Sequence, residues 1–477
     1  MQDSRLLEIF QQLTKKEIRA LGKFVHSPYH NQRKDVIALF DYLRLTDWTN
    51  NPELSTRKKA FQYVFPNQPF KEKQIRYTIS FLFQIIKEFL AIQHFKSNTT
   101  NVQIATIQSF RQKGSERLFQ QQWKNTAQLL EKSPLRNQTY FYQKYLLESE
   151  RYQFTVGRSR GRTDGLLEAA DHLDQFFMID KLRQSARSLS YKTLGSDSFQ
   201  PKFLQEILAF VNQKNIENDN KMMFQNPATA IYYHCYQILA AEDSLSYFQQ
   251  LRQLIAQHST CFTAAELQDI YSFALNYCIK QLNAQNLAFG QEALELYQEG
   301  LRQEIFFENG HLSRFNYKNI VALGLGLKEF NWVAQFIETY QPFLDKKYRE
   351  SAYNYNLALL YYRTEKYDQA MTLLQKVGTK DVLNNLTARR MLVTIYYDRG
   401  DFEPLYSLLD SFQNYIYRKS GLDYQRRMYL NFIKFTRKLL KIKRMSVTQI
   451  RDLQSEIEQT KHLVEKEWLL NKLSSTH

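Results

Sequence analysis

The chain has 477 residues and is basic, with 64 Lys and Arg against 48 Asp and Glu. A single hydrophobic core stops growing near roughly 250–300 residues, so the chain forms either several domains or a repeat array. Its 14 glycines and 9 prolines together make about 5% of the residues, whereas these two residue types make up about 12% of average proteins. Sheets and sandwiches need turn residues about every 8–12 positions. The composition therefore excludes most β architectures and predicts an all-α protein.

Residues 1–100 are expected to form an N-terminal helical unit. Thr14 and Glu17 have the spacing of a capping box, which predicts that a helix begins there. The segment Leu21–Asn31 is similar to the start of uncharacterised helical proteins from Bacteroidota. A long helix over 71–93 carries apolar residues on most of its sides. This pattern predicts burial and argues against insertion of the helix into a DNA groove.

Residues 101–225 are expected to form irregular helix pairs. A glycine-rich loop over 157–165 and a polar linker over 212–220 interrupt them. The loop lacks the Gly-Lys-Ser/Thr ending of a phosphate-binding loop, and we expect it to be mobile and exposed. Its three arginines would otherwise contact phosphate or an acidic surface: Arg158, Arg160 and Arg162.

Residues 226–417 are expected to form repeats of a helix pair, and internal similarity extends from about 262 to 417. Units that begin at Arg314, Ser351 and Leu386 follow one another at spacings typical of helical repeats. The unit at Ser351 has two small residues, Ala358 and Ala370, and two aromatic residues, Tyr361 and Tyr367. These units resemble tetratricopeptide repeats. The resemblance implies an α-solenoid of antiparallel helix pairs, because a pair with one apolar face must stack on its neighbours. Larger residues stand where the family has small ones: Val333, Val393 and Leu405.

The resemblance also implies a groove lined by the first helix of each pair. Aromatic rings between cations suit an extended peptide, since rings supply contact area and cations bind carbonyls or carboxylates. The alternative is that the tyrosines pack against neighbouring helices. The family's asparagine clamp is not expected, because other residues hold its positions: Ala322, Leu359 and Thr394. The expected groove residues are Phe315, Lys318, Tyr355, Tyr362, Arg363, Arg390 and Tyr397.

Residues 421–477 are expected to form two long C-terminal capping helices, one ending near Arg444 and one starting at Ser446. Terminal repeats must cover their outer faces, which explains such a cap. The first of these helices carries a basic patch on one side and Phe435, Leu439 and Ile442 on the other. Three roles are open for this patch: a solvated outer face, a contact with nucleic acid or an acidic protein, or binding to a membrane surface. Its residues are Arg426, Arg427, Lys434, Arg437, Lys438, Lys441, Lys443 and Arg444.

Motifs of catalysis do not emerge from the sequence. The adjacent pair His234–Cys235 diverges by about 100° on a helix and makes a poor metal site. The three cysteines, Cys235, Cys261 and Cys278, fit neither a disulfide framework nor zinc ligation. Unpaired thiols and the absence of a secretory signal predict a cytoplasmic protein without a membrane span. We expect no cofactor, no metal and no enzyme activity.

Three functions remain open from the sequence alone. The preferred hypothesis is a non-enzymatic scaffold that binds a protein or peptide in the concave groove of its repeats. The alternative is a nucleic-acid-associated factor that uses the basic helix 426–444 and the basic N-terminal unit. The third is an enzyme whose site is assembled from distant residues.

Overall fold

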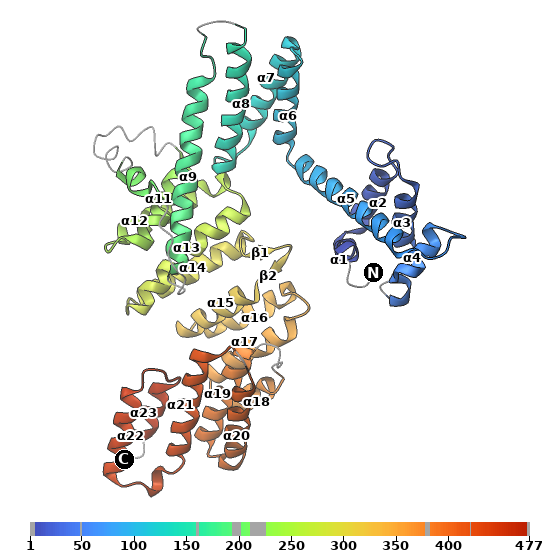
Figure 1. The fold of residues 1–477 in the computed structure, drawn as a ribbon. Coiled ribbons are helices and arrows are strands. Elements are labelled where there is room, and N and C mark those ends of the chain that lie inside the picture. Colours follow the sequence, from blue (N-terminus) through green and yellow to red (C-terminus); the bar gives the residue numbers. More distant parts are fainter. Residues whose placement is uncertain are drawn as a thin grey trace. The chain divides into compact units, whose positions relative to one another are not determined.

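A computed structural model describes residues 5–47, 50–158, 162–192, 202–209, 226–376, 382–419 and 421–474. The described chain is almost entirely helical, apart from one two-stranded hairpin of β1 (Phe307–Glu308) and β2 (His311–Leu312). It folds into two compact units. The first comprises Met1–Leu182 with Phe203–Ala230, and the second comprises Arg183–Lys202 with Ile231–His477. The all-α fold class is therefore confirmed (Figure 1).

The N-terminal helices surround one apolar core, whose centre includes Leu39, Phe61 and Ile86. The predicted capping box is present, because Thr14 Oγ1 accepts from Glu17 N–H at 3.2 Å and Glu17 Oε2 accepts from Thr14 N–H at 2.7 Å. The elements are α1 (Arg5–Gln12), α2 (Lys15–Val25), α3 (Lys34–Leu45), the 3-10 turn η1 (Pro52–Ser55), α4 (Arg57–Val64) and α5 (Glu72–Ser97).

Helix α5 is buried on one side only, so the predicted burial of residues 71–93 is wrong for its outer face. Ile75, Leu82 and Phe89 lie in the core, whereas Tyr77 is 55% exposed and Phe81 is 46% exposed. The guanidinium of Arg33 lies 4.0 Å from the Phe81 ring centroid. The ring quadrupole attracts a cation placed over its face, so the exposed Phe81 ring gains a favourable contact with Arg33.

Four helices follow α5 in the first unit. The predicted loop after residue 156 is anchored at both ends. Arg158 pairs with Glu116 and donates to the Gly114 carbonyl at 3.1 Å. Gly165 has a φ of +86°, and a Cβ there would lie 2.7 Å from the Glu148 carbonyl oxygen. Arg160 lies outside the described residues, as does the predicted linker 212–220. The helices are α6 (Thr99–Gln112), α7 (Glu116–Lys132), α8 (Gln138–Val156) and α9 (Leu166–Lys192), which continues into the second unit.

From α13 to α20, each helix packs on the next helix in the chain (Figure 1). The strongest packing joins α13 to α14, α15 to α16, α17 to α18 and α19 to α20, and α17 also contacts both α15 and α19. The elements are α11 (Pro227–Ala240), α12 (Leu245–His258), η2 (Ser259–Cys261), α13 (Ala264–Asn283), α14 (Ala288–Arg302), α15 (Arg314–Gly326), α16 (Phe330–Tyr340), η3 (Gln341–Phe343), α17 (Arg349–Arg363), α18 (Tyr367–Leu374), α19 (Val382–Arg399) and α20 (Phe402–Arg418).

Small residues let the paired helices approach closely. Ala358 and Ala370 are completely buried in a shared cluster between α17, α18 and α19. In the preceding pair Val333 replaces the small residue, and Gly324 opposite leaves the space that its side chain needs. A Cβ at position 324 would lie 2.5 Å from Val333 Cγ2. The departure from the repeat pattern is thus compensated by a partner nine positions away.

The C-terminal residues share one core with α19 and α20, centred on Phe412, Phe432 and Leu469. The predicted helix that starts at Ser446 is confirmed, together with its capping box to Gln449. It ends at Gln459, however, and the helix before it ends at Leu439, so the prediction of two long helices, the first ending near Arg444, is wrong. Glu465 has a φ of +54° and ends the connection to a separate helix. The elements are α21 (Asp423–Leu439), η4 (Ile442–Arg444), α22 (Val447–Gln459) and α23 (Lys466–Ser474).

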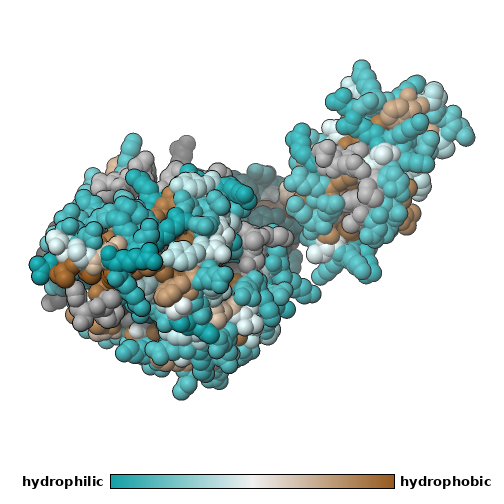
Figure 2. Space-filling model, turned by 90° about the horizontal axis from the view of Figure 1, so that it is seen from below, coloured by the Kyte–Doolittle hydropathy of each residue, from teal (hydrophilic) through white to brown (hydrophobic). Residues whose placement is uncertain are grey.

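The visible face of the molecule in Figure 2 is mainly hydrophilic, with apolar side chains in small separate patches. Within the described part of the chain, no helix has the length and apolar character needed to cross a bilayer.

Candidate functional site

The predicted groove residues lie on α15, α17 and α19, which are the first helices of three successive pairs. We call the side of these helices that carries them the first-helix face; its predicted members are Phe315, Lys318, Tyr355, Tyr362, Arg363, Arg390 and Tyr397.

A contact between α15 and α19 crosses the middle of the first-helix face. Lys318 Nζ donates a hydrogen bond of 2.9 Å to Asn384 Oδ1, and the same ammonium lies 5.0 Å from the Tyr355 ring centroid. Tyr355 is only 2% exposed. Its ring therefore packs under the lysine, as the alternative hypothesis of inter-helix packing expects, and offers no surface to a peptide.

The two ends of the α15–α17 surface differ from its centre. At one end Phe315 is 64% exposed, and the Arg314 guanidinium lies 4.8 Å from its ring and 4.3 Å from the Tyr348 ring. At the other end Arg363 is exposed, and the Tyr362 hydroxyl is 3.0 Å from Thr394 Oγ1. Phe315 at one end and Arg363 at the other are therefore accessible.

The last part of the first-helix face is covered by the chain's own C-terminal segment. Arg390 forms an ion pair with Glu465, 75 residues away. The Tyr397 ring meets the Trp468 ring edge-on with 5.2 Å between centroids. Asp398 accepts from Trp468 Nε1 at 3.3 Å and pairs with Lys472 at 3.0 Å. Burial raises the pKa of Tyr397 above its ordinary value. Sequence reasoning missed this contact. Its signal in the sequence is Trp468, the one tryptophan of residues 421–477.

The first and second helices of these three pairs differ in their charged residues. Helices α15, α17 and α19 together carry seven Lys and Arg against two carboxylates. Helices α16, α18 and α20 carry four carboxylates against one arginine. These charges do not all lie on opposite sides, because Arg389 contacts Tyr415 and Ser411 of α20, and Arg399 pairs with Asp368 of α18.

The basic patch on α21 is partly neutralised within the fold. Lys434 and Lys438 both bind Glu456 of α22, the former at 2.8 Å, and these bonds hold the pKa of Glu456 below its usual range. Arg437 pairs with Asp410 at 2.6 Å. As expected, Phe435, Leu439 and Ile442 are buried on the opposite side. Arg426 donates to the Lys419 carbonyl; the exposed members are Arg427, Lys441, Lys443 and Arg444, together with Lys434.

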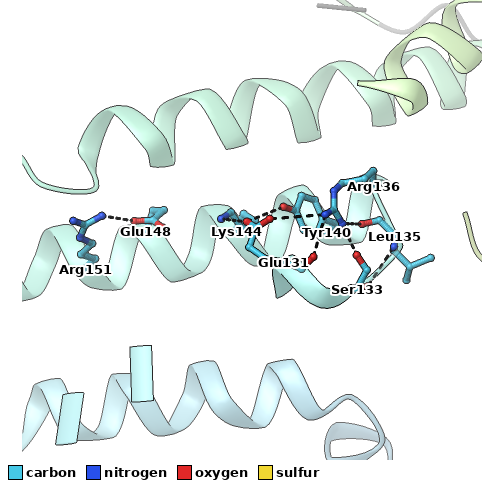
Figure 3. Close-up of polar contacts among 8 residues, drawn as sticks. All are labelled: Glu131, Ser133, Leu135, Arg136, Tyr140, Lys144, Glu148 and Arg151. Carbon is cyan, nitrogen blue, oxygen red and sulfur yellow. Dashed lines mark hydrogen bonds and ion pairs between the residues drawn. The ribbon is translucent and has the colours of Figure 1, made fainter. Parts of the chain in front are cut away.

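A polar network in the first unit was not anticipated from the sequence. Figure 3 shows Glu131, Arg136, Tyr140 and Lys144 grouped near the start of α8. Lys144 Nζ donates to Glu131 at 2.9 Å, and this bond lowers the pKa of Glu131. The Arg136 guanidinium lies 4.5 Å from the Tyr140 ring and donates to backbone carbonyls near the end of α7. The network ties the end of α7 to α8.

Further along α8, Glu148 is buried and burial raises its pKa. Arg151 donates to it at 3.4 Å and lies 4.8 Å from the Trp123 ring. On α9 burial lowers the pKa of His172. These groups are held by neighbours along the helices, which is the arrangement of a structural network.

The histidine and cysteine pair considered above is inside the protein. His234 is buried beside the Tyr247 ring, and burial lowers its pKa to about 4, so it is neutral near pH 7. Burial also raises the pKa of Cys235, and raises that of Cys278 to about 12. In the described ranges, no three His, Cys, Asp or Glu residues gather as metal ligands would.

Comparison of the chain with models of protein families, with curated proteins and with solved structures finds no match in any of the three.

Proposed function

We propose that the chain is a non-enzymatic scaffold. In this proposal residues 226–417 form a tetratricopeptide-like α-solenoid of antiparallel helix pairs, and a protein or peptide partner binds the first-helix face in the cytoplasm. The contacts of α17 with both α15 and α19 support the stacking of first helices. The bond from Lys318 to Asn384 supports a concave first-helix face, because helices two pairs apart meet across it only where the stack curves inward.

The observation that carries the proposal is the segment Glu465–Trp468. It lies on Arg390 and Tyr397, two residues chosen from the sequence as groove lining. The same residue types therefore already hold a protein segment by an ion pair and a ring contact. Aromatic and arginine side chains are the ones that dominate binding energy at interfaces.

A crosslinking experiment tests the proposal. A photoreactive residue at position 315 or 363 should crosslink a discrete partner in cells, because both positions are exposed on the first-helix face. The same residue at position 406, exposed on the second helix α20, is the matched control. Equal crosslinking from both faces, or none from position 315 or 363, contradicts the proposal.

The alternative function, association with nucleic acid, is favoured by one observation. Five cations of the basic patch remain exposed around α21 and η4. Phosphate contacts of this kind weaken steeply with salt. Replacement of Lys441, Lys443 and Arg444 by glutamate should then abolish binding to a labelled oligonucleotide at low salt. No oligonucleotide binding by the unaltered chain at about 50 mM salt would remove this alternative.

A further inference from the structure

We infer that the first half of α9 is a second interaction surface, and that its occupant is a basic amphipathic helix of a partner protein. The surface lies in the first unit, so the inference does not depend on the proposed function of the repeats. It combines a row of exposed apolar side chains with carboxylates beside the row. We call the row the α9 stripe; its members are Leu166, Ala170, Leu173 and Phe177.

The members of the α9 stripe follow one another at steps of four, three and four residues. This spacing places side chains on one side of a helix and is the pattern by which two helices interlock. Its three large members are between 38% and 40% exposed, and Leu167 beside them is 72% exposed. Exposed apolar side chains that adjoin one another mark interaction sites, whereas isolated ones need no explanation.

Helix α8 borders one edge of the α9 stripe and leaves the other edge open (Figure 1). On the bordered edge, the Phe176 ring lies 5.1 Å from the Tyr142 ring of α8. Tyr142 is itself 43% exposed, so the apolar surface continues onto α8. The stripe ends at Phe177, where the Lys181 ammonium lies 5.6 Å from the ring centroid. A partner therefore has access from the open edge, on which Leu167 lies.

The open edge is acidic. From Thr163 to Asp180 the chain has five carboxylates and no Lys or Arg, although its net charge is +16. None of the exposed carboxylates here forms an ion pair with a cation of the described chain. The nearby cations Lys144 and Arg151 are bound to carboxylates of α7 and α8. The exposed carboxylates are Glu168, Asp171 and Asp174.

This combination of apolar and acidic side chains selects the occupant. Negative charge would repel a nucleic acid or an anionic membrane from the open edge. A second copy that presented the same stripe would place its own carboxylates beside these ones. A partner helix with leucines at the matching spacing buries the stripe, and lysines on its flank pair with Asp171 and Asp174, as flanking charges do between paired helices.

The experiment uses the full chain and three fluorescein-labelled peptides designed as helices. The basic peptide has leucines at steps of four and three residues and lysines at the flanking positions. The acidic peptide has glutamate for each lysine, and the scattered peptide has the composition of the basic one with its leucines distributed around the helix. The basic peptide should bind at least about tenfold more tightly than either of the others by anisotropy. Added salt should weaken its binding, because the paired charges are exposed.

Variants that remove leucines locate the site. Leu167→Ala with Leu173→Ala should weaken binding of the basic peptide by about tenfold. The control, Leu118→Ala with Leu129→Ala, removes two exposed leucines of α7 and should leave binding unchanged. All four leucines lie outside the buried core, and circular dichroism checks that both variants remain folded.

Charge reversal tests the carboxylates separately. Asp171→Lys with Asp174→Lys should weaken binding of the basic peptide and make the chain prefer the acidic one. The control, Glu242→Lys with Asp243→Lys, adds the same charge at exposed positions between α11 and α12. It should keep the preference for the basic peptide.

The outcomes that overturn the inference are distinct. They are no binding of the basic peptide, equal binding of the basic and acidic peptides, equal loss in the α9 and α7 variants, or an unchanged preference after charge reversal at positions 171 and 174. Light scattering of the full chain tests a second copy as occupant. Self-association that Leu167→Ala with Leu173→Ala abolishes would assign the stripe to that copy and also overturn the inference. Crosslinking from position 315 is a separate measurement, so the proposed function stands or falls independently.

Discussion

Lys318 donates a hydrogen bond to Asn384 at 2.9 Å while its ammonium lies over the ring of Tyr355. Three first helices meet at this one side chain, although 66 residues separate donor from acceptor. The lysine thereby turns a predicted peptide contact into an internal brace between first helices, whereas Phe315 and Arg363 at the two ends of the α15–α17 surface remain exposed.

A double-mutant cycle on this brace should show coupling. Lys318→Ala and Asn384→Ala each remove one side of the hydrogen bond, and the pair should couple by about 0.5–1.5 kcal/mol. Chemical denaturation monitored by hydrogen exchange in α15 and α19 measures this coupling energy. Additive effects of the two changes would show that the bond contributes nothing to the stacking of these helices.

Gly324→Ala should destabilise the second unit by about 1–3 kcal/mol, because overpacking a tight contact forces side chains or backbone to shift. The new methyl would lie 2.5 Å from Val333 Cγ2. Gly326→Ala is the matched control on the same helix, since nothing lies within 4 Å of its Cβ position. The control should be neutral or slightly stabilising. Thermal unfolding compares the two, and Val333→Ala should restore part of the loss in Gly324→Ala.

Trp468→Ala should loosen the C-terminal helices by about 2 kcal/mol, since it removes a large half-buried ring. The indole contacts Tyr397 and lies 6.1 Å from the Phe432 ring. Hydrogen exchange should accelerate in α23 and leave α13 unchanged. Trp468→Phe keeps a ring and should lose much less. Equal protection of α23 in all three proteins would mean that Leu469 and Leu473 alone hold this helix.

Acidification should weaken the contact between α21 and α22. In the folded state, hydrogen bonds from Lys434 and Lys438 lower the pKa of Glu456 below its ordinary value of 4.5. A depressed folded pKa gives stability that is fully present above the unfolded value and is lost as pH falls through the folded value. The protection of α22 amides should therefore decrease below about pH 4.5. In Glu456→Gln this step should vanish; an unchanged pH profile would exclude Glu456 as its source.

The contribution of Glu148 to stability should change with pH in the opposite direction. Burial raises its pKa, so the charged carboxylate opposes folding at neutral pH and the penalty declines as pH falls toward the folded pKa. Glu148→Gln should therefore be neutral or stabilising near pH 7, in spite of the lost 3.4 Å contact from Arg151. Unfolding followed by Trp123 fluorescence reports on this region. A large loss of stability would show that the Arg151 contact outweighs desolvation.

The sequence by itself determined the features that depend on neighbouring residues. The capping boxes at Thr14 and Ser446 formed as predicted, because the cap and its partner stand three residues apart and need no other part of the chain. The all-α class followed from scarce glycine and proline. The turns between α17 and α18, and between α19 and α20, lie where polar residues interrupt the apolar pattern.

Only the tertiary structure decided which side chains are accessible. Tyr355 and Tyr362 lie two turns apart on one helix, yet one is buried under Lys318 and the other is half exposed. Phe81 faces solvent although the apolar content of α5 indicated burial. Arg390 found its carboxylate 75 residues away, at Glu465. Periodicity specifies the face of a helix on which a residue lies, but burial depends on what the rest of the chain brings to that face, and no local pattern contains that information.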